Sequence, residues 1–185
     1  MKNVVIIIPT YNESGNVTPV TKALGKVFNT LSSDYSPMIL FVDDQSPDGT
    51  STVIRTLIKK YPYVKLLENK RKGGLGHAYK KGMIYATDKL KADIVFEFDA
   101  DLSHDPTKIP QMLGAIKSGS DLVLGSRYMT GGGIPSNWPW YRKFLSVTGN
   151  IFIRLVMGNL KIKDWTTGYR AITRHVVESI VLQLS

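Results

Sequence analysis

The stretch Ile94-Val95-Phe96-Glu97-Phe98-Asp99-Ala100-Asp101 decides the fold class. Its apolar first part is typical of a buried strand, and two carboxylates follow where that strand should end. In an extended chain, residues two positions apart point the same way, so Asp99 and Asp101 can face one ligand. Carboxylates held this close repel each other unless a cation lies between them. The sequence therefore predicts a site where Mg²⁺ or Mn²⁺ bridges to a substrate diphosphate.

Extended and helical segments alternate on both sides of this stretch. Apolar runs typical of strands lie at 4–8, 38–42, 64–67, 93–98, 121–125 and 169–170. Amphipathic spacing predicts helices at 17–31, 53–61, 76–88, 109–116, from 141 onward and at 176–184. Continuous apolar strands separated by such helices predict an α/β fold in three α/β/α layers, built on a mostly parallel, Rossmann-like sheet.

Four of the predicted strands run directly into polar motifs. These motifs occupy residues 9–13, 43–49, 99–101 and 126–128. In α/β sheets, ligands bind beyond the carboxyl ends of the strands, and these motifs fall there. One such turn would be ordinary helix capping, but four with this many carboxylates predict a binding site.

Composition narrows the class of protein. The chain has 185 residues, 43% of them apolar, which suffices for one ordinary core. No stretch reaches the roughly 18 to 20 apolar residues of a membrane-spanning helix. The net charge of +9 favours phosphate-rich partners, whereas nucleic acid is not expected because no nucleic-acid-binding motif is visible. The absence of cysteine excludes disulfides and thiol catalysis and fits a cytoplasmic location.

Several motifs together resemble a known family. Pro-Thr-Tyr-Asn-Glu at 9–13, Val-Asp-Asp-Gln-Ser-Pro-Asp-Gly-Thr at 42–50 and Asp-Ala-Asp-Leu-Ser-His-Asp-Pro at 99–106 are similar to those of family 2 glycosyltransferases of the GT-A fold. Gly-Ser-Arg-Tyr at 125–128 and Thr-Gly-Tyr-Arg at 167–170 narrow the resemblance to dolichyl-phosphate or polyprenyl-phosphate mannose synthases. The resemblance implies a mannosyltransferase that uses GDP-mannose and a lipid phosphate.

The resemblance also implies the donor site. Residues at the first two strand ends would contact the nucleotide base and ribose: Pro9, Tyr11, Glu13, Val42 and Asp44. Asp101 would be the main metal ligand and a catalytic residue. Asp99 would contact the ribose or the metal, with Ala100 between them in the donor site, and Ser103 would be a weaker metal ligand. We expect His104 to be a turn residue, because Mg²⁺ and Mn²⁺ favour oxygen.

The resemblance places the acceptor side later in the chain. Arg127 would bind the sugar diphosphate or the acceptor phosphate, a role suited to a guanidinium. Arg142 and Ser146 lie four residues apart, so on one helix they share a face and could hold a lipid phosphate. Asp164 is a catalytic candidate that could orient the acceptor or the sugar. Because a phosphate monoester is already largely anionic at neutral pH, we expect a single inverting displacement on mannose.

Two alternatives remain open at this stage. A different family 2 enzyme could use UDP-glucose or a similar donor, because sugar specificity depends on pocket shape. The second alternative is an inactive nucleotide-sugar-binding domain. It stays open because a basic loop that is common near the end of such enzymes does not occur before Ser185. We expect one GT-A catalytic domain over 1–185, truncated at its C-terminus and peripheral to the cytoplasmic face of a membrane. A Trp- and Tyr-rich cluster at 138–141 could face the lipid or pack in the core.

Overall fold

The computed structural model describes residues 1–129, 132–133, 139–158 and 162–183. Within these residues, one six-stranded sheet has the order β3-β2-β1-β4-β6-β5. Its strands are β1 (Lys2–Thr10), β2 (Tyr35–Asp43), β3 (Val64–Glu68), β4 (Ile94–Glu97), β5 (Leu122–Leu124) and β6 (Arg170–Thr173). The helices are α1 (Val17–Phe28), α2 (Thr50–Lys60), α3 (Leu75–Asp88), α4 (Ile109–Lys117), α5 (Trp140–Val156) and α6 (Arg174–Gln183), with a short 3₁₀ turn at Pro106–Lys108.

The strand directions bring the polar motifs to one edge of the sheet. β1 pairs in parallel with β2 and β4, so that Ile6 lies opposite Ile39 on one side and Phe96 on the other. β6 is antiparallel to both β4 and β5, and β5 therefore points the same way as β4. The carboxyl ends of β1, β2, β4 and β5 thus face the same side, as the predicted mostly parallel sheet requires.

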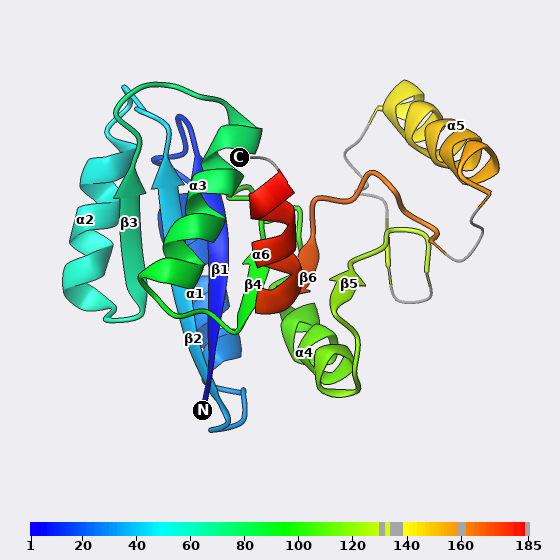
Figure 1. Ribbon diagram of the computed structural model, residues 1–185. Coiled ribbons are helices and arrows are strands. Elements are labelled where there is room, and N and C mark those ends of the chain that lie inside the picture. Colours follow the sequence, from blue (N-terminus) through cyan, green and yellow to red (C-terminus); the bar gives the residue numbers. More distant parts are fainter. Residues whose placement is uncertain (130–131, 134–138, 159–161, 184–185) are drawn as a thin grey trace.

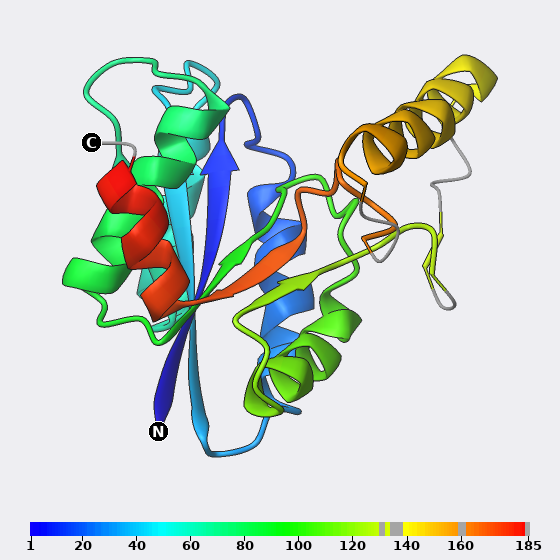
Figure 2. The ribbon, with the colours of Figure 1, turned by 45° about the vertical axis from the view of Figure 1, so that its right-hand side comes forward.

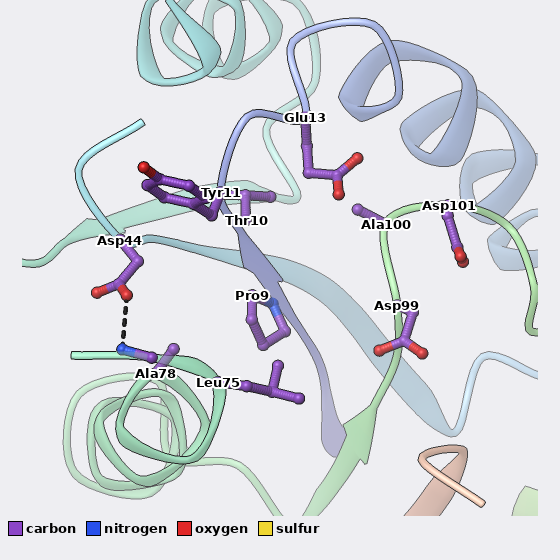
Figure 3. A pocket seen from close by; sticks show the side chains of 11 residues that line it. Pro9, Thr10, Tyr11, Glu13, Asp44, Leu75, Ala78, Asp99, Ala100 and Asp101 are labelled. Atoms are coloured by element: carbon purple, nitrogen blue, oxygen red, sulfur yellow. Dashed lines mark hydrogen bonds between the residues drawn. The ribbon is translucent and has the colours of Figure 1, made fainter. Parts of the chain in front are cut away.

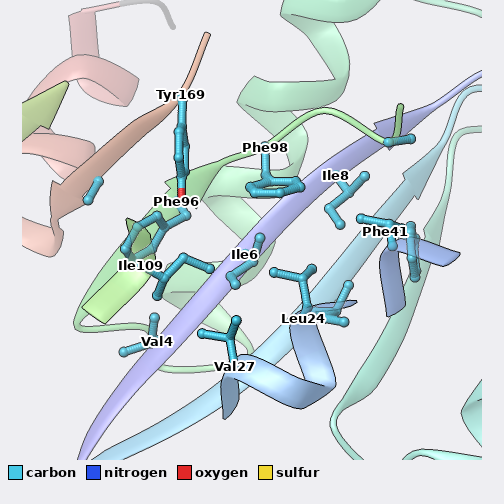
Figure 4. Close-up of a cluster of buried hydrophobic side chains, with 14 of the residues drawn as sticks. Val4, Ile6, Ile8, Leu24, Val27, Phe41, Phe96, Phe98, Ile109 and Tyr169 are labelled. Carbon is cyan, nitrogen blue, oxygen red and sulfur yellow. The ribbon is translucent and has the colours of Figure 1, made fainter. Parts of the chain in front are cut away.

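Helices cover both faces of this sheet, as Figures 1 and 2 show. Alternate residues of β1 divide between the two layers, because successive side chains of a strand point to opposite faces. Val4, Ile6 and Ile8 are fully buried against α1, α2 and α4, the cluster drawn in Figure 4. Val5 and Ile7 are equally buried against α3 and α6. The predicted three-layer α/β fold is confirmed.

The first predicted helix is shorter than expected. The apolar spacing predicted a helix over 17–31, but α1 ends at Phe28. Thr30 and Leu31 continue in tight turns, in which their N–H groups donate to the carbonyls of Val27 and Phe28. Leu31 still packs against the core from this turn, which explains why its position fitted the helical pattern.

Helix α5 stands away from the two layers in both ribbon views (Figures 1 and 2). Many of its large apolar side chains are exposed: Trp140, Tyr141, Phe144, Leu145, Val147, Ile151, Phe152, Leu155 and Val156. In the ranges described above, no helix has the length and apolarity needed to cross a bilayer.

Candidate active site

A cavity of about 260 Å³ opens at the carboxyl edge of the sheet, between the ends of β1, β2 and β4 and the start of α3 (Figure 3). Its lining consists of Pro9, Thr10, Tyr11, Glu13, Asp44, Gly74, Leu75, Ala78, Asp99, Ala100 and Asp101. Most of the donor-site residues expected from the sequence therefore meet in one place. In Figure 3, Asp44 lies on one side of the cavity and the Asp99–Asp101 turn on the other.

The two carboxylates of the turn differ in their surroundings. Asp101 is exposed, and its Oδ1 accepts the backbone N–H of Ser103 at 2.9 Å. Asp99 is half-buried: Tyr79 Oη donates to its Oδ1 at 3.4 Å, and His104 Nε2 lies 3.3 Å from its Oδ2. The backbone turns directly after Asp101, where Leu102 has a positive φ of 58°. Asp101 is thus the more available oxygen ligand.

The chemistry of this turn fits a divalent cation, because carboxylate oxygens suit Mg²⁺ and Mn²⁺. In the described part of the chain, however, no three His, Cys, Asp or Glu residues gather closely enough to hold a metal alone. Two carboxylates leave most of an octahedral shell open, which diphosphate oxygens and water could complete. Ser103 is exposed and joins the turn through its backbone N–H, so its hydroxyl as a ligand stays a prediction.

Asp44 anchors the loop that begins α3. Its carboxylate accepts Asn69 Nδ2 at 2.8 Å, Gly74 N at 2.8 Å and Gly73 N at 3.0 Å. Burial by itself would raise the pKa of Asp44, but these donors outweigh it and the pKa falls below its usual value. Gly74 has φ 82°, which favours glycine, and it forms the N-cap of α3. The ionised carboxylate of Asp44 therefore holds residues 69–74 in place at one side of the cavity.

Tyr11 presents an aromatic ring at the cavity rim. The ring residue is 41% exposed, and Lys72 Nζ lies 3.5 Å from the ring centroid, which is a close cation–π contact. Glu13 is half-buried and accepts Asn16 Nδ2 at 2.6 Å. A planar base could stack on Tyr11 beside Lys72. The sequence motifs alone did not predict this contact between Lys72 and Tyr11.

Val42 does not line the cavity with its side chain. It is fully buried in the layer between the sheet and α3. A Cβ built on Gly82 of α3 would come within 3.1 Å of Val42 Cγ2, which shows how closely the helix packs there. The alternation of β2 explains this, because Asp43 and Val42 must point to opposite faces. The side chain of Val42 is a core residue, contrary to its expected place in the donor pocket.

Arg127, after β5, and Asp164, before β6, form a bidentate ion pair, and neither residue lines the cavity. Arg127 Nε donates to Asp164 Oδ2 at 2.8 Å, and Nη2 donates to Oδ1 at 2.7 Å. The Asp164 side chain has 0% exposure and that of Arg127 22%. Burial would raise the pKa of Asp164, yet the hydrogen bonds and charge of Arg127 hold it below its usual value. Asp164 thus stays an anion that orients Arg127.

The acceptor residues expected on α5 are only partly described. The Arg142 side chain lies outside the described part of the structure. Ser146 Oγ is 2.6 Å from Tyr128 Oη, one residue after Arg127. The buried Asn150 ties α5 to the following loop, because its Nδ2 donates to Thr166 Oγ1 and its Oδ1 accepts Trp165 N. Thr166 also accepts from Arg127 Nη2 at 2.7 Å.

Sequence reasoning missed several residues of this edge. Tyr79 and Asn150 are interior helix positions whose patterns resemble ordinary amphipathic faces. Asn69 precedes the basic run at 70–72 and gave no signal of its contact with Asp44. The run Gly73-Gly74-Leu75 was a usable signal, because glycine is one of the residues accepted at a helix N-cap.

The sequence profile described as Glycosyl transferase family 2 matches residues 5–181. The chain is 40% identical over 178 residues to a polyprenol monophosphomannose synthase of Mycolicibacterium smegmatis, covering 96% of this chain and 64% of that protein. It is 37% identical over 178 residues to a dolichol-phosphate mannosyltransferase of Pyrococcus furiosus, covering 96% of this chain and 48% of that protein. The chain thus spans about half to two thirds of the length of these relatives.

A solved mannosyltransferase of Pyrobaculum calidifontis, in complex with GDP-Man and Mn²⁺, matches this fold with a TM-score of 0.63. It is 21% identical, and the match covers 96% of this chain and 46% of that one. The likeness agrees with a GT-A fold. On the profile match and the two relatives, this chain belongs to glycosyl transferase family 2.

Proposed function

We propose that this chain is the catalytic part of a mannosyltransferase that moves mannose from GDP-mannose to a dolichyl or polyprenyl phosphate. The observation that carries the proposal is the cavity in which the Asp99 and Asp101 carboxylates meet the turn after β1. The relatives named as polyprenol- and dolichol-phosphate mannose enzymes, at 40% and 37% identity, support this choice of donor and acceptor.

The donor would lie across the cavity in Figure 3. Its base would stack on Tyr11 near Lys72, and Pro9 would shape the turn below it. The ribose and diphosphate would extend to Asp99 and Asp101. Mg²⁺ or Mn²⁺ bound there would neutralise the charge that develops on the departing nucleoside diphosphate. Arg127 would hold anionic phosphate oxygens in the orientation that its pair with Asp164 sets.

The reaction needs no strong base on the protein. The second pKa of a phosphate monoester is about 6, so its oxygen is already largely anionic at neutral pH. That oxygen would form a bond to the anomeric carbon of mannose as the bond to the diphosphate oxygen breaks, with inversion. GDP then leaves as the anion, and no proton has to be removed from the acceptor. The protein contributes orientation and charge stabilisation.

The lipid acceptor implies contact with a membrane surface. Trp140 and Tyr141, at the start of α5, are 78% and 55% exposed, and both residue types suit a membrane interface. Further along the helix, Phe152 and Leu155 are 67% and 69% exposed. We place α5 at the cytoplasmic face of a membrane, where Ser146 and Arg142 would lie near the acceptor phosphate.

Calorimetric titration of the full chain with GDP-mannose and UDP-glucose, with and without Mn²⁺, tests the donor. We expect Mn²⁺-dependent binding of the guanine nucleotide. Transfer of radiolabelled mannose to a polyprenyl phosphate in detergent then tests the reaction, with release of one GDP for each mannose transferred.

The other outcomes separate the alternatives. Preference for UDP-glucose would assign the chain to a different donor and contradict the proposal. Tight GDP-mannose binding without transfer to any lipid phosphate would indicate a nucleotide-sugar-binding domain. Absence of binding to either nucleotide would contradict a donor site in this chain.

A further inference from the structure

His104 is more than a turn residue. Its ring is stacked on Tyr169, with centroids 4.9 Å apart and an interplanar angle of 8°. Phe98 packs edge-on against the His104 ring, with centroids 5.3 Å apart and an interplanar angle of 84°. The His104 side chain is only 12% exposed. Two aromatic neighbours on different elements therefore fix the plane of this imidazole before any ligand binds.

Both ring nitrogens lie close to Asp99, the first carboxylate of the turn. Nδ1 accepts the backbone N–H of Asp99 at 3.1 Å, and Nε2 lies 3.3 Å from Asp99 Oδ2. A nitrogen that accepts a hydrogen bond carries no proton, so in the neutral ring the proton is on Nε2, the nitrogen near the carboxylate. One side chain thus contacts the backbone and the carboxylate of the same residue.

Asp99 is also held from the other side. Tyr79 Oη of α3 donates to its Oδ1, while His104 faces its Oδ2. Among the described residues, Asp101 accepts one hydrogen bond, from the backbone N–H of Ser103. The structure therefore divides the two carboxylates into one whose orientation is fixed by neighbours and one that is exposed.

We propose that His104 is a positioning residue for the donor site: it fixes the backbone and the carboxylate of Asp99 in the orientation that the metal–diphosphate group of the donor needs. The inference rests on the proposed function, because it concerns the same site. His104 acts through Asp99, since Nδ1 accepts the Asp99 amide and Nε2 lies near the Asp99 carboxylate. Outer residues that orient a ligand in this way typically change metal affinity about 10- to 100-fold.

Ring nitrogen NMR tests the geometry without any nucleotide. In the ¹⁵N-labelled full chain, long-range ¹⁵N–¹H spectra distinguish the two neutral tautomers of each of the three histidines. We expect the signals of His104 to show a proton on Nε2 and none on Nδ1. The replacement of His104 assigns those signals. A ring protonated on Nδ1 alone would overturn the proposal, because it could not accept from the Asp99 amide.

Matched variants test the consequence for binding. His104→Asn keeps an acceptor near the place of Nδ1, whereas His104→Gln moves its polar group toward the place of Nε2. His104→Phe keeps a ring against Tyr169 but has no acceptor. We expect Mn²⁺-dependent GDP affinity to fall at least about tenfold in His104→Phe and less in His104→Asn. Equal affinity in His104→Phe and the wild type would overturn the proposal.

Two controls separate positioning from simple stability. Tyr169→Phe removes the hydrogen bond from Tyr169 Oη to Asp105 O but keeps the stacked ring, so it should lose stability without losing Mn²⁺–GDP affinity. If His104→Phe does not fold, the comparison of His104→Asn with His104→Gln decides, and a better-binding Gln variant would contradict the role of Nδ1. If the wild type binds no Mn²⁺–GDP, the proposed function fails, while the tautomer measurement still tests the orientation of Asp99.

Discussion

Asp164 and Arg127 are joined by two charge-assisted hydrogen bonds of 2.7 and 2.8 Å, with the carboxylate fully buried. In a third hydrogen bond, the backbone N–H of Arg127 donates to Asp164 Oδ2, which joins the loop after β5 to the segment before β6. A carboxylate engaged in this way is poorly placed to take a proton from an acceptor. The two hydrogen bonds instead hold the Arg127 guanidinium in one orientation.

Replacing Asp164 by Asn should lower the free energy of unfolding by about 3 kcal/mol, because it leaves a partly buried guanidinium without its charge partner. Urea unfolding measures the loss. The control Thr166→Val removes a neutral hydroxyl that accepts from Arg127 and Asn150 but keeps the Asp164 charge, and it should cost about 1 kcal/mol. Unchanged stability with a lost rate and an altered pH–rate profile would instead identify Asp164 as a base.

Asp101→Asn should abolish Mn²⁺-dependent nucleotide binding while leaving the fold intact. Asp101 is exposed, and within the described part of the chain it accepts one backbone N–H, so its replacement costs little packing. We expect at least about a 100-fold loss of transfer, because metal-mediated charge stabilisation is worth several kcal/mol. Asp105→Asn is the matched control: Asp105 accepts from Thr107 N as a cap, a role that Asn also fills. Equal losses in both variants would contradict a special role for Asp101.

The loop at 69–74 should loosen in acid. The folded pKa of Asp44 lies below its ordinary value, because the amide donors of Asn69, Gly74 and Gly73 outweigh the effect of burial. A carboxyl with a depressed pKa stabilises the fold above its unfolded pKa of about 4, and this contribution is lost as the pH falls through the folded value. Hydrogen exchange at the Gly73 and Gly74 amides, compared between pH 6 and pH 3, should show the loss of protection. Asp44→Asn should already be less protected at pH 6, and a loop equally protected in that variant would contradict the anchoring role.

Two glycines of α3 should respond to alanine in opposite directions. A Cβ at Gly82 would lie 2.7 Å from Ile7 Cγ2 and 3.1 Å from Val42 Cγ2, so Gly82→Ala should cost about 1 to 3 kcal/mol through overpacking. At Gly76 nothing lies within 4 Å, and Gly76→Ala should stabilise by up to about 1 kcal/mol through helix propensity. Urea unfolding of both variants checks the pair. Equal effects would show that α3 does not pack on the sheet at Gly82 as described.

Glutamate on α5 should weaken membrane binding. Phe144 and Phe152 are 60% and 67% exposed, so their joint replacement by Glu removes apolar surface without disturbing a core. Sedimentation with phosphatidylglycerol vesicles measures binding. We expect at least about a tenfold loss, because burial of each aromatic side chain in the membrane contributes up to about 3 kcal/mol. The double replacement of Ile58 and Ile84 by Glu, on α2 and α3 at positions 36% and 37% exposed, controls for the two added charges. Equal losses in that control would indicate an electrostatic effect of the whole surface.

Much of the site could be predicted because its residues follow strand ends. Asp99 and Asp101 follow the end of β4 closely, and Tyr11 comes directly after β1, so the parallel topology brings them together. His104 and Asn150 could not be assigned a role in the same way, because their contacts depend on how loops and helices from distant parts of the chain pack. Val42 shows the converse error, since a position inside a motif can still point into the core.

The sequence by itself determined the α/β class, the order of the elements and the edge where the polar motifs meet, because hydrophobic periodicity and strand direction are local properties. Tertiary structure alone decided which polar partner each carboxylate has: Asn69 and two glycine amides for Asp44, His104 and Tyr79 for Asp99, Arg127 for Asp164. These pairings depend on burial and join side chains that are far apart in the sequence. The physical reason is that desolvation and hydrogen-bond geometry exist only after the layers have packed.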